Sequence, residues 1–332
     1  ENNTLYRYEN ITEDGLNSNS IMDFCPIDDS YLLLGTANGL SYVNIYDSHL
    51  DSVRFGYFNR DSVSLPRGGS PALSVNENIF VLSGLLDTTA ATGEELMGTG
   101  ISYSIDEGEN WVYLPQPKDE IPASGQYTTI SWGEQTITAL AVTTEINNIT
   151  YDLAIGGEYI YAASWAGGIR RYGPLYAEQQ HWRIIPLPMD SDTNLVCGQI
   201  DTETYKLNPN DPVNGGNHNH KGFSVYVVND IIWVGTANGI NKGVIDTDCI
   251  NWEQHYTAAW DNISGDWVIG FTYQEFFERI WAITWAGEGN NEKNALSYTD
   301  DGGEHWHVTS PSGYSEKVYN LYANENRIWA AS

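Results

Sequence analysis

One seven-residue stretch occurs twice in this chain, almost letter for letter. Residues 34–40 read LGTANGL and residues 234–240 read VGTANGI. Each copy follows an apolar, β-rich run and precedes another short run, so its Asn-Gly pair is typical of a tight turn between two paired strands. A copied hairpin of this kind indicates that the protein is built from a repeated structural unit.

Looser copies of the same hairpin start at residues 159, 279 and 327, where the sequence reads YIYAASWAGGI, RIWAITWAG and RIWAAS. Repeats of a four-stranded unit at roughly 40 to 50 residues are the signature of a β-propeller, whose blades bury their faces against one another. The sequence therefore predicts an all-β fold, a β-propeller of four-stranded antiparallel blades. Six or seven blades are compatible with the pattern.

The predicted strands fill five blades and begin a sixth. They span residues 20–26, 31–36, 39–45 and 53–59; 72–75, 78–82, 100–104 and 111–114; 149–155, 159–164, 168–172 and 182–187; 223–228, 231–236, 239–244 and 252–256; 267–273, 279–285, 295–298 and 306–309; and 318–322 and 328–331. Residues 4–9 are expected to supply the outer strand that closes the ring. No low-complexity linker divides the chain, so a single domain over 1–332 is predicted, its last blade unfinished at Ser332 and continued beyond it.

Charge narrows the classes of partner. The formal net charge is -29, from 44 acidic and 15 basic residues, and such a surface repels nucleic acid and anionic lipid. No apolar run approaches the roughly 20 residues that a membrane helix needs. We expect neither nucleic-acid binding nor membrane insertion, and the charge suits solubility in an exposed or salty environment.

The first residue suggests that the protein is exported, and the cysteines do not decide the question. The chain begins at Glu1 rather than at Met, as a mature secreted or cell-surface protein or a trimmed chain would. Three cysteines do not make a disulfide framework. Cys25 lies in an apolar strand, where a buried free thiol is expected, and a bridge between Cys197 and Cys249 is left open.

Two further segments match each other, residues 101–111 and 296–306, and both satisfy the pattern S/T-x-D-x-G-x-x-W. The pattern resembles the Asp-box, or bacterial neuraminidase repeat, of many propellers. Its Ser/Thr and Asp side chains can bond turn backbone, its Gly permits positive φ, and its Trp packs between blades. We assign a structural role to the matching residues: Ser104, Asp106, Gly108, Trp111, Thr299, Asp301, Gly303 and Trp306.

Residues 12–21 read TEDGLNSNSI and precede the first LGTANGL. Together they resemble the repeat of two-component-regulator-type propellers. Combined with Asp-boxes, this is similar to large extracellular propeller proteins of Bacteroidetes-like bacteria, many of which are exported by type IX secretion with a C-terminal sorting domain. No sorting domain is visible in this sequence. The resemblance spans most of the chain and implies the fold, which proteins of many functions share.

The predicted layout places every long connection on one side of the propeller, namely residues 83–99, 116–148, 189–222 and 285–294. Long loops on one face of a rigid scaffold are where binding sites are usually built. Trp165 and Trp285 occupy matching positions there, and exposed indoles beside carboxylates and amides suit sugar stacking. The alternative is that both pack between loops. Trp132, Arg170 and Arg171 are weaker candidates by the same logic.

Residues 208–221 are the least repeat-like segment. In an extended backbone His218 and His220 would point to one side, as two metal ligands should. The spacing nominates no third or fourth ligand, so metal binding is a weak hypothesis and a loop anchored by hydrogen bonds is favoured. Residues 190–192 (DSD) offer oxygen ligands suited to calcium, without EF-hand spacing. No cofactor is predicted.

Enzyme hypotheses find less support. Sialidases need an arginine cluster, and this chain is poor in arginine. Xyloglucan-cleaving propeller glycosidases need a facing carboxylate pair, and no spacing selects two of the carboxylates on the loop side: Glu94, Glu95, Asp119, Glu120, Glu134, Asp190, Asp192 and Glu288.

The function predicted from the sequence is a secreted or cell-surface recognition or scaffold module whose ligand is carbohydrate or an extracellular protein. A non-enzymatic role is favoured. One alternative is a polysaccharide-active glycoside hydrolase or lyase. The other is a structural subunit of an extracellular assembly, for which self-assembly through an exposed strand edge is the expected property.

Overall fold

The computed structural model describes residues 15–28, 30–45, 53–58, 64–90, 93–120, 125–246, 249–289, 291–309 and 316–332. Contacts between residues divide the chain into two compact units, residues 1–116 with 145–150, and residues 117–144 with 151–332. The single domain over 1–332 stays a prediction. The closing strand predicted at residues 4–9 and the first three residues of the segment 12–21 lie outside the described residues.

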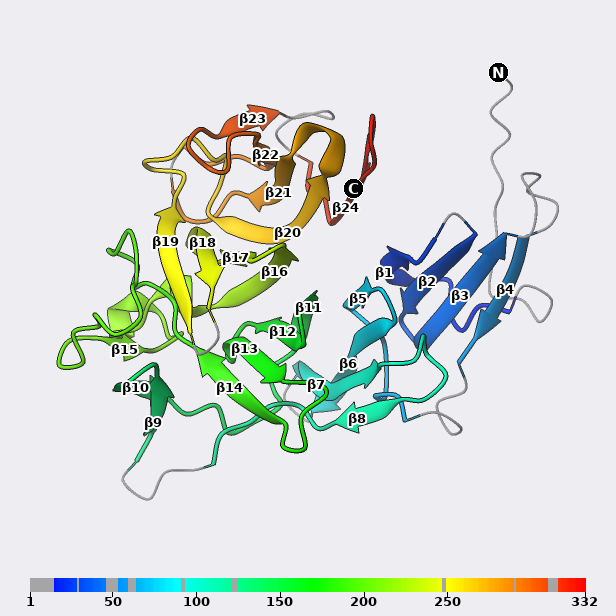
Figure 1. Ribbon diagram of the computed structural model, residues 1–332, viewed down its shortest axis with the longest axis horizontal. Coiled ribbons are helices and arrows are strands. Elements are labelled where there is room, and N and C mark those ends of the chain that lie inside the picture. The colour runs from blue at the N-terminus through cyan, green and yellow to red at the C-terminus, as the bar shows by residue number, and fades with distance from the viewer. Residues whose placement is uncertain are drawn as a thin grey trace. The chain divides into compact units, whose positions relative to one another are not determined.

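The first unit contains two antiparallel sheets of four strands. Their orders are β1-β2-β3-β4 and β5-β6-β7-β8, each in sequence order, as in a propeller blade (Figure 1). The strands are β1 (Ile21–Pro26), β2 (Tyr31–Thr36), β3 (Gly39–Ile45), β4 (Val53–Tyr57), β5 (Leu73–Asn76), β6 (Ile79–Ala90), β7 (Gly93–Ser104) and β8 (Val112–Leu114).

The second unit holds three more sheets of this kind and a two-stranded one. They are β11 (Thr150–Gly156), β12 (Tyr159–Ser164), β13 (Gly168–Gly173) and β14 (His181–Ile185); β16 (Gly222–Val228), β17 (Ile231–Thr236), β18 (Gly239–Ile245) and β19 (Ile250–Tyr256); β20 (Trp267–Gln274), β21 (Arg279–Trp285), β22 (Ala295–Thr299) and β23 (His307–Thr309); and β24 (Asn320–Ala323) with β25 (Ile328–Ala331). Short 3-10 turns η2 (Pro212–Asn214), η3 (His218–His220) and η4 (Glu275–Phe277) are the helical elements of the described residues. The predicted all-β class and its four-stranded antiparallel blades are confirmed.

The repeated hairpin has the same geometry in both copies. Thr36 pairs with Gly39 and Thr236 with Gly239, so Ala-Asn forms the two-residue turn and the glycine begins the next strand. Both glycines have φ of 98°, a left-handed value that an L side chain rarely adopts. Each threonine hydroxyl accepts the Asn N–H and donates to the glycine carbonyl.

Neighbouring blades are tied through their first strands. The Asp23 carboxylate on β1 accepts the N–H of Leu73 on β5 at 2.7 Å, and Asp152 on β11 accepts the N–H of Val225 on β16 at 2.9 Å. The carboxylate thereby satisfies a backbone donor that the next blade would leave unpaired. Apolar side chains fill the space between blades, including Leu33, Leu82 and Phe80 in the first unit and Ile169, Val234 and Trp252 in the second.

The predicted loop at residues 83–99 is wrong. β6 and β7 each run for 12 residues and pair as far as Ala90 with Gly93, so most of this connection is a two-stranded ribbon. The ribbon's backbone is also bonded from the sides, since Gly69 exchanges hydrogen bonds with Leu85 and the Gly98 N–H donates to the Glu145 carbonyl. These partners are distant in sequence, which is why the local pattern of glycine and acidic residues did not indicate strands.

A second correction concerns the predicted connections 116–148 and 189–222. They contribute β9 (Tyr127–Trp132), β10 (Gln135–Leu140) and β15 (Lys206–Leu207), which form a three-stranded sheet in the order β15-β10-β9. β10 and β15 are parallel. A two-residue strand has no detectable sequence period, so only its long-range pairing defines it.

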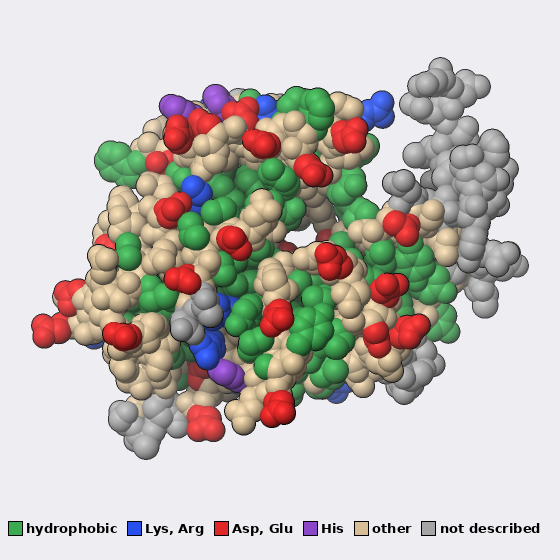
Figure 2. Space-filling view, in the orientation of Figure 1, with side chains coloured by type: hydrophobic (Ala, Val, Ile, Leu, Met, Phe, Trp, Pro, Cys, Tyr) green, Lys and Arg blue, Asp and Glu red, His purple; other side chains and the backbone are tan. Residues whose placement is uncertain are grey.

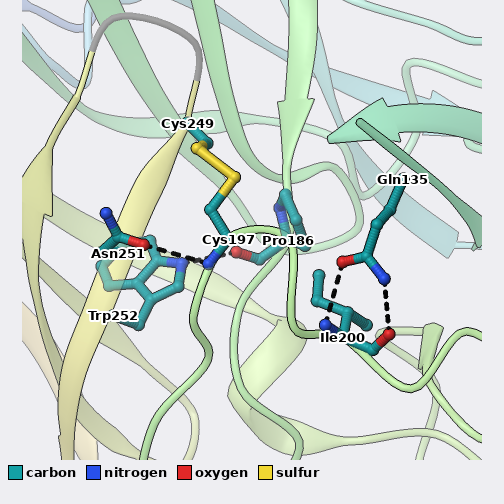
Figure 3. Close-up of a disulfide and its surroundings, with 7 residues drawn as sticks. All are labelled: Gln135, Pro186, Cys197, Ile200, Cys249, Asn251 and Trp252. Atoms are coloured by element: carbon teal, nitrogen blue, oxygen red, sulfur yellow. Dashed lines mark hydrogen bonds between the residues drawn. A yellow bond between two sulfur atoms is a disulfide. The ribbon is translucent and has the colours of Figure 1, made fainter. Parts of the chain in front are cut away.

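A disulfide anchors the loop that leads to β15. Cys197 is bonded to Cys249, which directly precedes β19, and the Cys197 N–H donates to the side chain of Asn251 at 3.0 Å (Figure 3). The Gln135 amide bonds both the N–H and the carbonyl of Ile200, so the same loop is also held to β10. The bridge left open by the sequence is therefore present. Cys25 is a free, half-buried thiol whose pKa burial raises to about 12.

The two S/T-x-D-x-G-x-x-W turns make closely similar hydrogen bonds. Ser104 and Thr299 accept the N–H of the motif glycine, each at 2.8 Å, and Asp106 and Asp301 accept the N–H four residues later. Both motif tryptophans pack on the preceding blade, Trp111 against Phe58 and Trp306 against Trp233 and Tyr256. The turns differ at the indole, because Trp111 Nε1 donates to the Gly108 carbonyl whereas Trp306 Nε1 has no partner among the described residues.

Candidate functional site

Trp165 lies in the turn after β12, within the second unit. The Gly167 N–H donates to the Ser164 hydroxyl at 3.0 Å and fixes this turn. The half-buried indole packs on Phe223, with ring centres 5.2 Å apart, and meets Trp267 edge to face at 6.2 Å. The Lys221 ammonium lies 4.9 Å from the centre of the Trp165 ring, which is a cation–π geometry.

Trp285 repeats this arrangement at the end of β21. The Lys317 ammonium lies 4.2 Å from its ring centre, and Tyr319 meets the ring edge to face at 5.0 Å. Its Nε1 donates to the Val318 carbonyl at 2.8 Å, which fixes the indole. In both cases the lysine lies one to three residues before the first strand of the next sheet. The aromatic residue two positions after the lysine is Phe223, within β16, or Tyr319, directly before β24.

Trp267 connects the two arrangements. It pairs with Trp285 across β20 and β21. Gly287 follows Trp285 by two residues and lies against the Trp267 ring. A Cβ added at Gly287 would be 2.9 Å from the Trp267 Cδ1. We call the set Trp165, Phe223, Trp267, Trp285 and Tyr319, with Lys221 and Lys317, the aromatic edge. Its residues lie on or directly beside four successive sheets of the second unit.

The aromatic edge combines cations with acidic neighbours. Burial lowers the pKa of Lys221, and the nearby carboxylates of Asp211, Asp190 and Glu288 act in the opposite direction. Lys317 is exposed. Flat apolar rings, ammonium donors and carboxylate acceptors together suit a ligand that offers both C–H faces and hydroxyl groups.

Other carboxylates near this edge hold loops. Asp190 accepts the N–H groups of His218 and Asn219 at 3.0 and 2.7 Å. Glu292 accepts those of Asp266 and Gly287 at 2.8 and 2.7 Å. Each Asp190 oxygen therefore accepts one backbone N–H and holds the loop, and calcium binding at residues 190–192 stays a prediction.

Asp266 is a residue that the sequence did not single out. Burial, with the nearby Glu292 and Asp261 carboxylates, raises its pKa to about 6, although its bond from the Ala258 N–H and the nearby His255 oppose the shift. It directly precedes Trp267 of the aromatic edge. A carboxyl group with a raised pKa beside a cluster of aromatic side chains is a candidate acid.

Several sequence candidates lie inside the fold instead of on the aromatic edge. Trp132 is 2% exposed within the core around β9 and β10. Arg170 is buried, with both terminal nitrogens bonded to Asp119. Arg171 is buried and stacks over the Tyr159 ring. These three buried side chains therefore lie outside the aromatic edge.

The two histidines do not form the expected ligand pair. Residues 218–220 are the 3-10 turn η3, so the extended backbone assumed for a metal pair is wrong. His220 is buried: its Nδ1 accepts the Asn208 N–H at 2.9 Å, and its Nε2 lies 3.1 Å from the Leu187 carbonyl. Such a ring is neutral, and burial lowers its pKa to about 4. His220 anchors the loop by hydrogen bonds, the reading that the sequence favoured.

Acidic side chains are scattered over the face shown in Figure 2. Among the predicted loop carboxylates, Asp119, Asp190 and Asp192 belong to the second unit and Glu95 to the first, and the Glu94 side chain lies outside the described residues. Within the described ranges no helix is long and apolar enough to cross a membrane.

No protein-family model matches the chain, and no curated protein matches it either. Solved structures whose backbone is similar to that of this chain include YCF48 bound to D1 peptide. That match has 14% sequence identity and a TM-score of 0.42, and it covers 94% of this chain and 88% of that one. The GH74 enzyme of Niastella koreensis gives 14% identity and a TM-score of 0.49, covering 90% of this chain and 38% of that one. PorZ, a surface component of the type IX secretion system of Porphyromonas gingivalis, gives 10% and 0.41, covering 90% and 35%.

The sheets of this chain themselves place it in the β-propeller class, as an all-β protein of four-stranded antiparallel blades.

Proposed function

We propose that this protein is an extracellular recognition module that binds carbohydrate along the aromatic edge. The observation that carries the proposal is the repeated pairing of an indole with a lysine, Trp165 with Lys221 and Trp285 with Lys317. Lys221 is only 8% exposed, and a core that only needed filling would not require a cation there, because desolvating an ammonium group costs free energy. The two tryptophans lie at the first and the third of three successive sheets, and such a repeated pair suits a ligand that is itself a repeating chain.

The chemistry of each pair fits a sugar. An indole can stack on the C–H face of a pyranose, and the ammonium group can donate hydrogen bonds to the hydroxyl or ring oxygens at its rim. The packing of Phe223, Trp267 and Tyr319 against the two indoles holds them in place. A rigid aromatic surface loses little conformational entropy on binding.

Extracellular location is supported by the Cys197–Cys249 disulfide. Disulfides persist in oxidising compartments and are rare in reducing ones. The resemblances to Asp-box and two-component-regulator-type repeats support the same location. They extend the proposal to a bacterial surface protein, with type IX secretion as its route. An extracellular protein is the second ligand class that this edge would accommodate.

A polysaccharide-active hydrolase is the second candidate function, favoured by Asp266 alone. A carboxyl group with a pKa of about 6 next to Trp267 could serve as a general acid. Glu292 nearby is bonded to backbone N–H groups and serves as a loop anchor rather than as its catalytic partner. Release of reducing ends from a bound glycan, abolished by Asp266→Asn with binding retained, would establish this function.

The test of the recognition function is a glycan-array screen of the purified protein, followed by calorimetry on the glycans that bind. Trp165→Ala and Trp285→Ala are each expected to weaken binding at least tenfold. Phe276→Ala is the matched control, since Phe276 is 69% exposed on η4 and lies outside the aromatic edge. Binding that persists in both tryptophan variants would remove the aromatic edge as the site.

A further inference from the structure

The most exposed tryptophan of the described residues lies away from the aromatic edge. Trp260 is 88% exposed, in the turn that follows β19. It lines a cleft of about 610 Å³ between β18, β19 and the second S/T-x-D-x-G-x-x-W turn, within the second unit. That volume lies in the range typical of small-molecule sites.

The turn that carries Trp260 is fixed on both sides. The Thr257 N–H donates to the Asp261 carboxylate at 2.8 Å, and the Thr257 carbonyl accepts the N–H groups of Trp260 and Asp261. Asn262 follows with φ of 55°, and its side-chain amide donates to the Trp306 carbonyl at 2.9 Å. A non-glycine residue in this conformation persists where its surroundings hold it. The indole is thus presented to solvent from an ordered backbone.

The walls of the cleft are polar and of mixed charge. On one side the Lys242 ammonium and the Glu253 carboxylate are 3.0 Å apart, with the Gln254 amide beside them. On the other side are the exposed Glu304 and His305, the latter held by a bond of 2.7 Å between its Nδ1 and the Asp301 carboxylate. Figure 2 shows acidic and histidine side chains side by side over β22 and β23.

We infer that this cleft binds a neutral oligosaccharide, with a pyranose ring stacked on Trp260. The C–H face of the pyranose ring can cover the exposed Trp260 indole. The hydroxyl groups of the sugar can donate to the carboxylates and accept from the lysine and amide groups. Three carboxylates against one lysine, Glu253, Asp261 and Glu304 with Lys242, disfavour uronates and sulfated sugars. A simple amine would leave the lysine and amide donors without a role.

This inference adds a second site and does not depend on the aromatic edge. The test is calorimetric titration of the whole protein with cellohexaose, xylohexaose and mannohexaose, with polygalacturonate as the anionic comparison. At least one neutral hexasaccharide is expected to bind, Trp260→Ala to weaken it at least tenfold, and Glu304→Gln to weaken it several-fold. Because Trp260 is almost fully exposed, its alanine variant should keep the thermal midpoint of the wild type.

Phe276→Ala, Trp165→Ala and Trp285→Ala separate the two sites. Affinity at the cleft should be unchanged in Phe276→Ala, and loss only in the Trp165 or Trp285 variants would assign the sugar to the aromatic edge and overturn the inference. Failure of all three neutral sugars to bind would overturn it as well. The inference would also be overturned if a lysine-rich peptide bound instead of the sugars and Trp260→Ala abolished that binding.

Discussion

The Arg170 guanidinium and the Asp119 carboxylate form a two-bond ion pair, with both N–O distances at 2.9 Å. The side chains are 6% and 12% exposed. Arg170 lies on β13 and Asp119 in the segment that leads to β9, so the pair joins these two parts of the second unit. Removing one partner of such a pair destabilises the folded state because the other charge stays buried without a counter-charge.

Asp119→Ala is therefore expected to lower the free energy of unfolding by about 3 to 5 kcal/mol. The matched control is Asp300→Ala, which removes the partner of Arg279 in a pair that is 21% and 39% exposed. That change is expected to cost about 1 kcal/mol or less. Urea unfolding of both variants measures the difference, and equal losses would contradict the assigned role of burial.

His220 predicts a loss of stability in acid. Its folded-state pKa of about 4 lies below the ordinary value of 6.5, so the unfolded chain binds more protons between these values. The contribution of His220 is fully present above pH 6.5 and is lost as the pH falls to 4, by up to about 3 kcal/mol. In His220→Gln the stability curve should be flatter over this window. A variant with an unchanged slope would show that the ring is not held neutral.

Asp266 predicts the opposite trend. Its folded-state pKa of about 6 exceeds the ordinary value of 3.8, so the folded state binds more protons between these values and loses stability as the pH rises through them. Asp266→Asn keeps an oxygen for the Ala258 N–H while removing the buried charge. We expect a gain of about 2 kcal/mol at pH 7.5 and none at pH 3.5. A loss at pH 7.5 would show that the charge itself is required.

The Cys197–Cys249 bridge closes a loop with a sequence separation of 52. The chain-entropy estimate for a loop of this length is about 4 kcal/mol. The double variant Cys197→Ser and Cys249→Ser should unfold at a lower guanidinium concentration, and a reducing agent should bring the wild type to the same midpoint. Cys25→Ser serves as the control that leaves the response to reductant intact.

Two adjacent glycines allow the cost of a left-handed φ to be measured separately from the cost of overpacking. Gly302 and Gly303 both have left-handed φ, of 72° and 101°, but an added Cβ at Gly302 meets open space, whereas at Gly303 it would lie 2.2 Å from the Tyr256 Oη. Gly302→Ala should cost about 1 to 2 kcal/mol, and Gly303→Ala about 1 to 3 kcal/mol more from overpacking. Tyr256→Phe combined with Gly303→Ala should recover part of that excess, as a double-mutant cycle would measure.

The blade pattern could be predicted from sequence because it is local and repeated. In both copies the threonine of TANG bonds the Asn N–H and the Gly carbonyl, which lie within three residues of it, and the glycine's positive φ depends on its own lack of a side chain. Alternation of apolar residues then fixes which face of each strand is buried. Trp165 and Trp285 were found as site candidates for the same reason, since they occupy equivalent positions in two copies.

The rest depended on contacts between residues far apart in the chain. Sequence does not show that Lys221 and Lys317 stack on those indoles, that Asp119 meets Arg170, or that the turn before Asn262 holds Trp260 in solvent. The spacing of His218 and His220 suggested ligands, yet the backbone curls into η3 because Asp190 binds two of its N–H groups. The sequence by itself determined the repeating hairpins and their turns, whose hydrogen bonds span only a few residues. Only the tertiary structure decided which charges are buried, which aromatic rings face water and where the candidate sites lie, because burial and long-range pairing are properties of the packed chain.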